Sequence, residues 1–269
     1  MAKARRSLAA EVLGRVRVAI GSLWLRAFIW RNRRSEPAAL FEMTWFKANR
    51  LGWLFDGLEQ YRNRFRHAWR DILFLRLLRY LDRAGVHCVP KVAVRGFEVI
   101  RSAATKSSVI VVLVHSPVDA VINRLFDEAG LPWVLIAKRA ESTRLKARLL
   151  GLAGALDVIP LTSDSLLATR RSLAQGRNVC ACVDFTLRAD PGALFVSPAL
   201  FDLAMRTGSA VVYAYTKVTN GGIIDVTCAG PRIDPSVATS KAWAEDFVAW
   251  LRDDQGDGRS RTVRKWVES

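Results

Sequence analysis

The first residue in this sequence that could carry out chemistry is a histidine at the end of an apolar run. His115 follows six consecutive apolar residues (109–114) in the stretch SSVIVVLVHSPVDAVINRLF, and Asp119 comes four positions later. A histidine whose other ring nitrogen is held by a carboxylate can take a proton from a bound hydroxyl or amine. The stretch therefore predicts that His115 is a general base and that Asp119 is its partner.

The same residues also fit a purely structural interpretation. Ser116 is a good N-cap, Pro117 is a good first helical residue, and Asp119 falls at the third helical position. Together they would form an S-x-x-D capping box at the start of an ordinary helix. His115 would then be a buried imidazole without a chemical role, and both interpretations stay open at this point.

Further charged residues follow the next apolar stretches. Lys138 and Arg139 come directly after PWVLIA, and Asp184 lies at the end of NVCACVDF with Arg188 four positions later. Basic groups near a histidine at a strand end suit a phosphorylated substrate or a phosphopantetheine carrier. A solvated helix face is the alternative for the cations that follow, Arg144, Lys146 and Arg148. An acid at the end of an apolar strand is costly to bury without a partner, which singles out Asp184.

No other catalytic pattern competes with this set. The sequence has no G-x-S-x-G turn, no G-x-G-x-x-G, no Walker-type loop and no H-E-x-x-H. Ser116 adjoins His115, but neighbours in sequence rarely orient as nucleophile and base. The four cysteines have no metal-ligand spacing and are expected to be reduced core thiols: Cys88, Cys180, Cys182 and Cys228. We therefore predict no metal site and no cofactor.

The elements that must position these residues alternate between strand and helix along residues 86–269. This alternation predicts an α/β fold with a mainly parallel sheet flanked by helices. In such sheets ligands bind at the carboxyl ends of the strands. His115, the Lys138–Arg139 pair and Asp184 each end or follow a strand, so sheet topology should bring them to one edge.

Residues 1–85 have a different character and are predicted to be a helical, basic region. The chain of 269 residues has a net charge of +16, and its first 80 residues contain 17 Lys and Arg against 6 Asp and Glu. Five of the nine tryptophans lie in the same part. Arginine interleaved with aromatic residues is typical of a surface that contacts an anionic membrane. Nucleic-acid binding is the weaker alternative, because no RNA-binding signature accompanies the charge.

The most apolar N-terminal stretch, VLGRVRVAIGSLWLRAFIW, is interrupted by Arg15, Arg17 and Arg26. A membrane span needs roughly 20 mostly apolar residues, so an interfacial helix is expected, with Val12 and Leu23 among the residues toward lipid. A basic helix packed on the rest of the protein is the alternative.

In their order along the chain, these features resemble the bacterial lipid A biosynthesis acyltransferases, the lauroyl and myristoyl transferases with a lysophospholipid acyltransferase-like fold. The similar stretches are the arginine- and tryptophan-rich N-terminus, the strand ending in His115 and the strand before Lys138–Arg139. LLATRRSLAQGRNV, VDFTLRADPGALFVSPA and LAMRTGSAVVYAYTKVTNGGIIDV continue the resemblance, which spans about residues 10–250.

The resemblance implies transfer of a fatty acyl chain from an acyl carrier protein or acyl-CoA to a hydroxyl of a lipid at the cytoplasmic face of the inner membrane. By position, His115 would be the general base, Asp184 the motif aspartate, and Lys138, Arg139 and Arg188 would contact substrate. Four residues separate the histidine from its acid in the family, whereas three separate His115 from Asp119. A catalytically silent relative that binds acyl chains or a carrier protein is therefore the alternative hypothesis.

Overall fold

The computed structural model describes residues 2–55, 69–187, 190–233, 239–254 and 262–263. The chain divides into two compact units. The first comprises Met1–Val92 together with Lys217–Ile224, and the second comprises Ala93–Thr216 together with Asp225–Ser269. The helical region predicted for residues 1–85 thus lies within the first unit, which also includes a short segment from late in the chain.

The described helices of the first unit are α1 (Ala2–Asn32), α2 (Pro37–Arg50), the 3₁₀ helix η1 (Gly52–Leu54) and α3 (Trp69–Arg83). Pro37 begins α2, and the carboxylate of Glu36 accepts hydrogen bonds from the first backbone amides of that helix. The late segment 217–224 is anchored to these helices. The Val218 amide donates to Asp71, and the Trp45 indole donates to the carbonyl of Asn220.

Helix α1 has two apolar faces. Val18, Gly21, Leu25 and Ile29, spaced three or four residues apart, are buried within the unit. The opposite face is exposed and also largely apolar, and it includes Val12, Leu13, Val16, Ile20, Leu23 and Trp30. No helix in the described part of the chain is long and apolar enough to cross a membrane.

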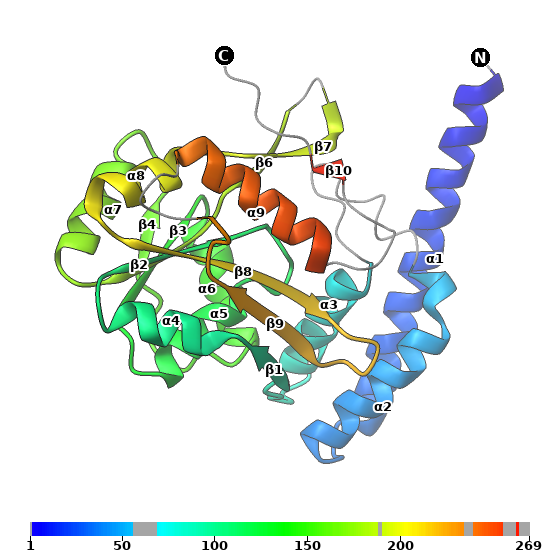
Figure 1. Cartoon of the computed structure of the whole chain (residues 1–269). Coiled ribbons are helices and arrows are strands. Elements are labelled where there is room, and N and C mark those ends of the chain that lie inside the picture. The colour runs from blue at the N-terminus through cyan, green and yellow to red at the C-terminus, as the bar shows by residue number, and fades with distance from the viewer. Residues whose placement is uncertain (1, 56–68, 188–189, 234–238, 255–261, 264–269) are drawn as a thin grey trace. The chain divides into compact units, whose positions relative to one another are not determined.

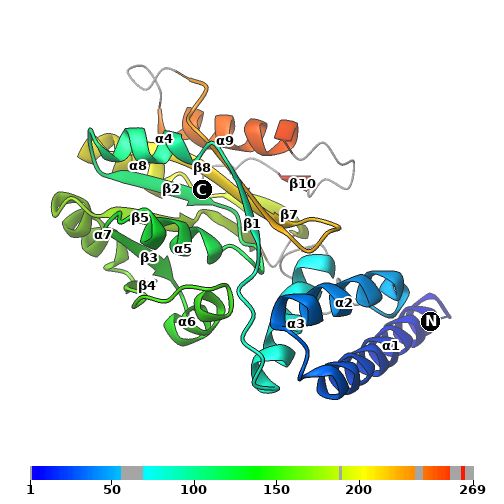
Figure 2. The ribbon, with the colours of Figure 1, turned by 90° about the horizontal axis from the view of Figure 1, so that it is seen from below.

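The second unit is built on the seven-stranded sheet, whose order is β1-β9-β8-β2-β5-β3-β4. The strands are β1 (Val92–Arg95), β2 (Val109–Leu113), β3 (Trp133–Ala137), β4 (Val158–Pro160), β5 (Asn178–Cys182), β8 (Ala210–Val218) and β9 (Ile224–Ala229). All pairings from β8 through β2, β5 and β3 to β4 are parallel, and Figure 2 shows these strands in that order. The predicted mainly parallel sheet is confirmed.

Six helices of the described chain flank this sheet: α4 (Phe97–Ala104), α5 (Val121–Glu128), α6 (Ala140–Leu149), α7 (Ser165–Ala174), α8 (Ala199–Thr207) and α9 (Ser240–Asp254). Helices α7, α8 and α9 pack against one another along one side, and α4, α5 and α6 lie on the other (Figure 1). With both faces covered, β2 is buried along its whole length, which explains its uninterrupted run of Val, Ile and Leu.

Three local predictions are corrected by the structure. Helix α5 begins at Val121 rather than at Pro117, because residues 117–120 form tight turns with hydrogen bonds between residues three apart. Residues 92–100 (VAVRGFEVI), whose pattern suggests a short strand or turn region, form β1 and then the start of α4. The loop expected after Asp184 instead contains β6 (Asp184–Leu187) and β7 (Asp190–Val196), which form a small sheet with β10 (Thr262–Val263). Most of the tail expected to be loose lies outside the described residues.

Candidate active site

The parallel register of two central strands places His115 beside Asp184. Leu113 at the end of β2 pairs with Cys182 at the end of β5, and the Val183 amide continues the ladder by donating to the Leu113 carbonyl at 2.9 Å. Two residues further along each strand are His115 and Asp184. Side chains two residues apart point to the same face of a strand, so a separation of 69 positions in sequence becomes a direct contact.

Asp184 holds both the ring and the backbone of His115. Its Oδ1 atom lies 2.8 Å from His115 Nδ1 and accepts the His115 backbone amide at 2.6 Å. The Asp184 side chain is fully buried, whereas 43% of the His115 side chain is exposed. Burial by itself would lower the pKa of His115, but the hydrogen bond and charge of Asp184, together with the charge of Asp119, raise this pKa above its ordinary value.

The prediction that Asp119 is the partner of His115 is wrong. Asp119 binds other groups, and the carboxylate paired with His115 is that of Asp184. Asp119 Oδ1 accepts a hydrogen bond from Lys146 Nζ at 2.7 Å, and its Oδ2 accepts one from the Ser116 amide at 3.4 Å. Although burial acts in the opposite direction, the ammonium group of Lys146 keeps the pKa of Asp119 below its usual value. This contact is one half of the expected capping box, since the Ser116 hydroxyl accepts the Val118 amide instead of the Asp119 amide, and it closes a turn before α5.

Lys146, for which a solvated helix face is the alternative to a role in the site, is partly buried and reaches into the site from α6. Besides Asp119, its ammonium donates to the carbonyl of Ser116 at 3.3 Å. These contacts tie α6 to the loop that follows His115. No local pattern in the sequence distinguishes Lys146 from Arg144 and Arg148 in the same helix.

Cys182 completes the cluster around the histidine. Its Sγ lies 3.5 Å from Asp119 Oδ2, and ligand-type atoms of His115, Cys182 and Asp184 all lie within 4.8 Å of one another. Burial, and then the charges of Asp119 and Asp184, raise the pKa of the Cys182 thiol well above its ordinary value. The thiol is therefore protonated at neutral pH and donates to Asp119.

The other predicted site residues are less closely joined to His115. Lys138 and Arg139 follow β3 at the same sheet edge and are exposed. Within the described part of the chain, neither side chain forms an ion pair or hydrogen bond. Both are thus available to an anionic ligand at this edge. Arg188 lies outside the described residues.

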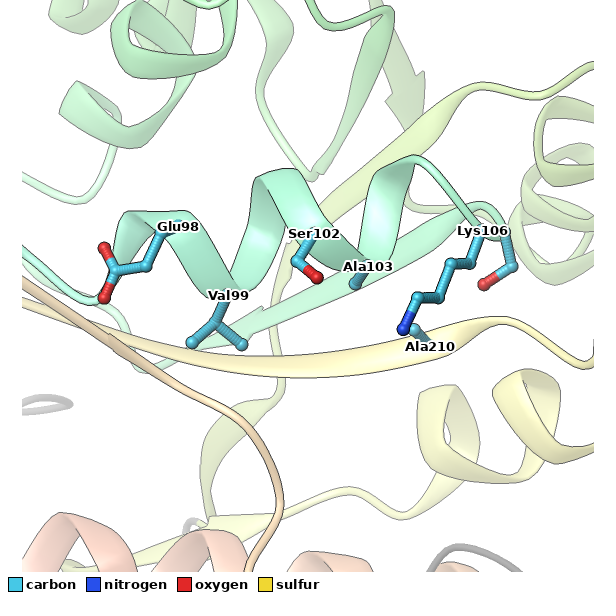
Figure 3. A pocket seen from close by; sticks show the side chains of 7 residues that line it. Glu98, Val99, Ser102, Ala103, Lys106 and Ala210 are labelled. Atoms are coloured by element: carbon cyan, nitrogen blue, oxygen red, sulfur yellow. The ribbon is translucent and has the colours of Figure 1, made fainter.

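A pocket of about 470 Å³ lies at the opposite end of the strands. It runs along α4 and is lined by Glu98, Val99, Ser102, Ala103, Lys106, Ser107 and Ala210 (Figure 3). Ala210 pairs with Val109, the first residue of β2, whereas His115 follows the last residue of that strand. The pocket is therefore separate from the histidine site.

No family model matches the chain, and no curated protein matches it significantly. The chemistry of the site must therefore be inferred from its own residues. These provide a half-exposed imidazole oriented by a buried carboxylate, next to a second carboxylate neutralised by a lysine.

Proposed function

We propose that the protein transfers a fatty acyl chain from a thioester, carried by an acyl carrier protein or coenzyme A, to a hydroxyl of a membrane lipid. The observation that carries the proposal is the His115–Asp184 pair at the carboxyl edge of the parallel sheet. The resemblance noted in the sequence supplies the reaction class. The exposed cations Lys138 and Arg139, at the same edge, suit the phosphate groups of such donors.

In the proposed reaction, Asp184 accepts the hydrogen on Nδ1 of His115, which leaves the lone pair of the imidazole on Nε2. Nε2 removes the proton of the acceptor hydroxyl while the oxygen attacks the thioester carbonyl carbon. The carbon–sulfur bond then breaks, and the thiolate leaving group takes the proton from the imidazolium. An ester and a free thiol result, and the charge of Asp184 stabilises the imidazolium that forms in between.

The proposal is tested by incubating purified protein with long-chain acyl-CoA or acyl carrier protein and vesicles of bacterial lipid extract. Mass spectrometry should detect a new acyl ester in the lipid fraction, and free thiol should appear at the same rate. If the protein binds the acyl donor yet transfers the chain to no hydroxyl or amine acceptor, the alternative of a silent acyl-binding relative replaces the proposal.

We further propose that the exposed face of α1 contacts the membrane that contains the acceptor. Ile20 and Leu23 on this face are 54% and 64% exposed. Arg26 and Arg31 are exposed on the same helix, where guanidinium groups can meet lipid phosphates. Nearby cations also stack on aromatic rings, as Arg33 does on Trp30 at 3.7 Å.

Replacing both Ile20 and Leu23 by Gln is expected to weaken binding to anionic vesicles by roughly tenfold or more, because each loses the free energy of burying an aliphatic side chain. Vesicle co-sedimentation measures the effect. The matched control is the double variant Val94→Gln and Met205→Gln, which alters two exposed apolar residues outside the N-terminal helices. Equal binding by both double variants would remove α1 from the membrane contact.

A further inference from the structure

One of the donor groups around His115 has no part in the proposed reaction. Three unlike groups, an imidazole nitrogen, a thiol sulfur and a carboxylate oxygen, come from His115, Cys182 and Asp184 and lie within 4.8 Å of one another. General-base catalysis needs the first and the last, but not the sulfur. Nitrogen, sulfur and carboxylate oxygen together are the ligand set of zinc and similar divalent cations.

A second observation points to a cation at the same place. Asp184 Oδ2 is buried and accepts no hydrogen bond from the described part of the chain, although Oδ1 accepts two. A buried carboxylate oxygen without a partner is costly. Lys146 already neutralises the neighbouring carboxylate of Asp119, whereas Asp184 has only the imidazole of His115 as an ion-pair partner in the described part of the chain.

We propose that His115, Cys182 and Asp184 form a binding site for Zn²⁺ or a chemically similar divalent cation, and that its occupancy blocks acyl transfer. On binding, the Cys182 thiol releases its proton to solvent and the thiolate becomes a ligand, beside the Asp184 carboxylate and the neutral imidazole. A water molecule completes four-coordination. The two negative ligands balance the charge of the cation.

The geometry requires only a small adjustment. Ligand atoms around tetrahedral zinc lie roughly 3.3–3.8 Å apart, so donor atoms that are up to 4.8 Å apart must approach by at most about 1.0–1.5 Å. A metal bound to Nδ1 replaces its 2.8 Å hydrogen bond to Asp184, and these two atoms then move slightly apart. Because neutral imidazole has one proton and one lone pair, coordination through either nitrogen leaves no lone pair to accept a proton. The metal-bound protein therefore has no general base at His115. This loss of activity rests on the proposed function, whereas metal binding itself does not depend on it.

Isothermal titration of the metal-free protein with Zn²⁺ tests the binding directly. One equivalent should bind to the wild type, and Cys182→Ser should weaken binding by at least about tenfold, since the soft sulfur ligand is lost. Co²⁺ should produce a thiolate-to-metal absorption band in the wild type that Cys182→Ser lacks. Cys88→Ser is the matched control, because Cys88 is also a partly exposed free cysteine but belongs to the first unit, and it should bind like the wild type.

Absence of stoichiometric binding, or equal affinity in the wild type and Cys182→Ser, would overturn the proposed metal site. Circular dichroism and thermal unfolding establish that Cys182→Ser is folded, and His115→Ala provides a second ligand deletion with the same expected loss of affinity. Where acyl transfer is measurable, Cys182→Ser should require at least about tenfold more Zn²⁺ for half-inhibition, relative to its own metal-free rate. Zinc binding by a protein with no acyl transfer would contradict the proposed function and leave the metal site standing.

Discussion

Asp184→Asn is expected to lower the rate of acyl transfer by about 10²–10⁴-fold, whereas Asp119→Asn should lower it by less than about tenfold. Asp184 Oδ1 accepts hydrogen bonds from both the ring nitrogen Nδ1 and the backbone amide of His115. An amide at this position lacks the negative charge that stabilises the imidazolium, and the buried NH2 group that takes the place of Oδ2 has no acceptor in the described part of the chain. Asp119, by contrast, is bonded to Lys146 and the Ser116 amide.

The kinetic parameters distinguish this effect from a general structural one. The loss in Asp184→Asn should fall on kcat, with the KM for the acyl donor changed little, because the carboxylate orients the base without touching the donor. Thermal unfolding of both variants controls for loss of structure. A larger loss in Asp119→Asn than in Asp184→Asn would restore Asp119 as the partner of His115 and contradict the geometry described above.

Gly96→Ala is expected to destabilise the second unit by about 2–4 kcal/mol or more. Gly96, between β1 and α4, has a φ of +75°, and a Cβ atom there would lie 2.0 Å from the backbone carbonyl oxygen of Cys228. Neither the left-handed backbone nor the carbonyl can move cheaply. Next to this contact, the Arg95 side chain donates hydrogen bonds to Asp225 and Thr227 of β9 at 3.1 and 3.0 Å.

Gly176→Ala is the matched control, since Gly176 also has a φ of +75° but has open space where the Cβ would lie. Gly176→Ala should lower the free energy of unfolding by only about 1–2 kcal/mol, the cost of a left-handed backbone for a residue with a Cβ atom. Urea unfolding of both variants gives the difference. A similar loss of stability in the two variants would mean that β9 moves away from Gly96 at little cost in free energy, and it would contradict this prediction.

The parallel sheet and the edge on which the site lies could be predicted because both follow from local patterns. The uninterrupted apolar runs that became β2, β3 and β5 indicate strands buried on both faces, and strand–helix alternation indicates parallel connections. The carboxyl ends of such strands meet at one edge. His115 and Asp184 were therefore expected there, and they lie there in contact.

The pairing within the site could not be predicted, because it depends on strand register. Asp119 is the nearest acid to His115 in sequence, but Asp184 becomes its neighbour only through the alignment of Leu113 with Cys182. Lys146 illustrates the same limit, since its contact with Asp119 depends on how α6 packs beside the loop after β2. The sulfur of Cys182 joins the cluster for the same reason, and no ligand spacing in sequence indicates it.

The most direct test of the central claim is the rate of ester formation in a single turnover, measured for the wild type and His115→Ala at saturating acyl donor and vesicle-bound lipid. With His115 as the base, we expect His115→Ala to bind the donor with similar affinity and to form ester about 10²–10⁴-fold more slowly. Equal rates in the two proteins would contradict the role of His115 in acyl transfer.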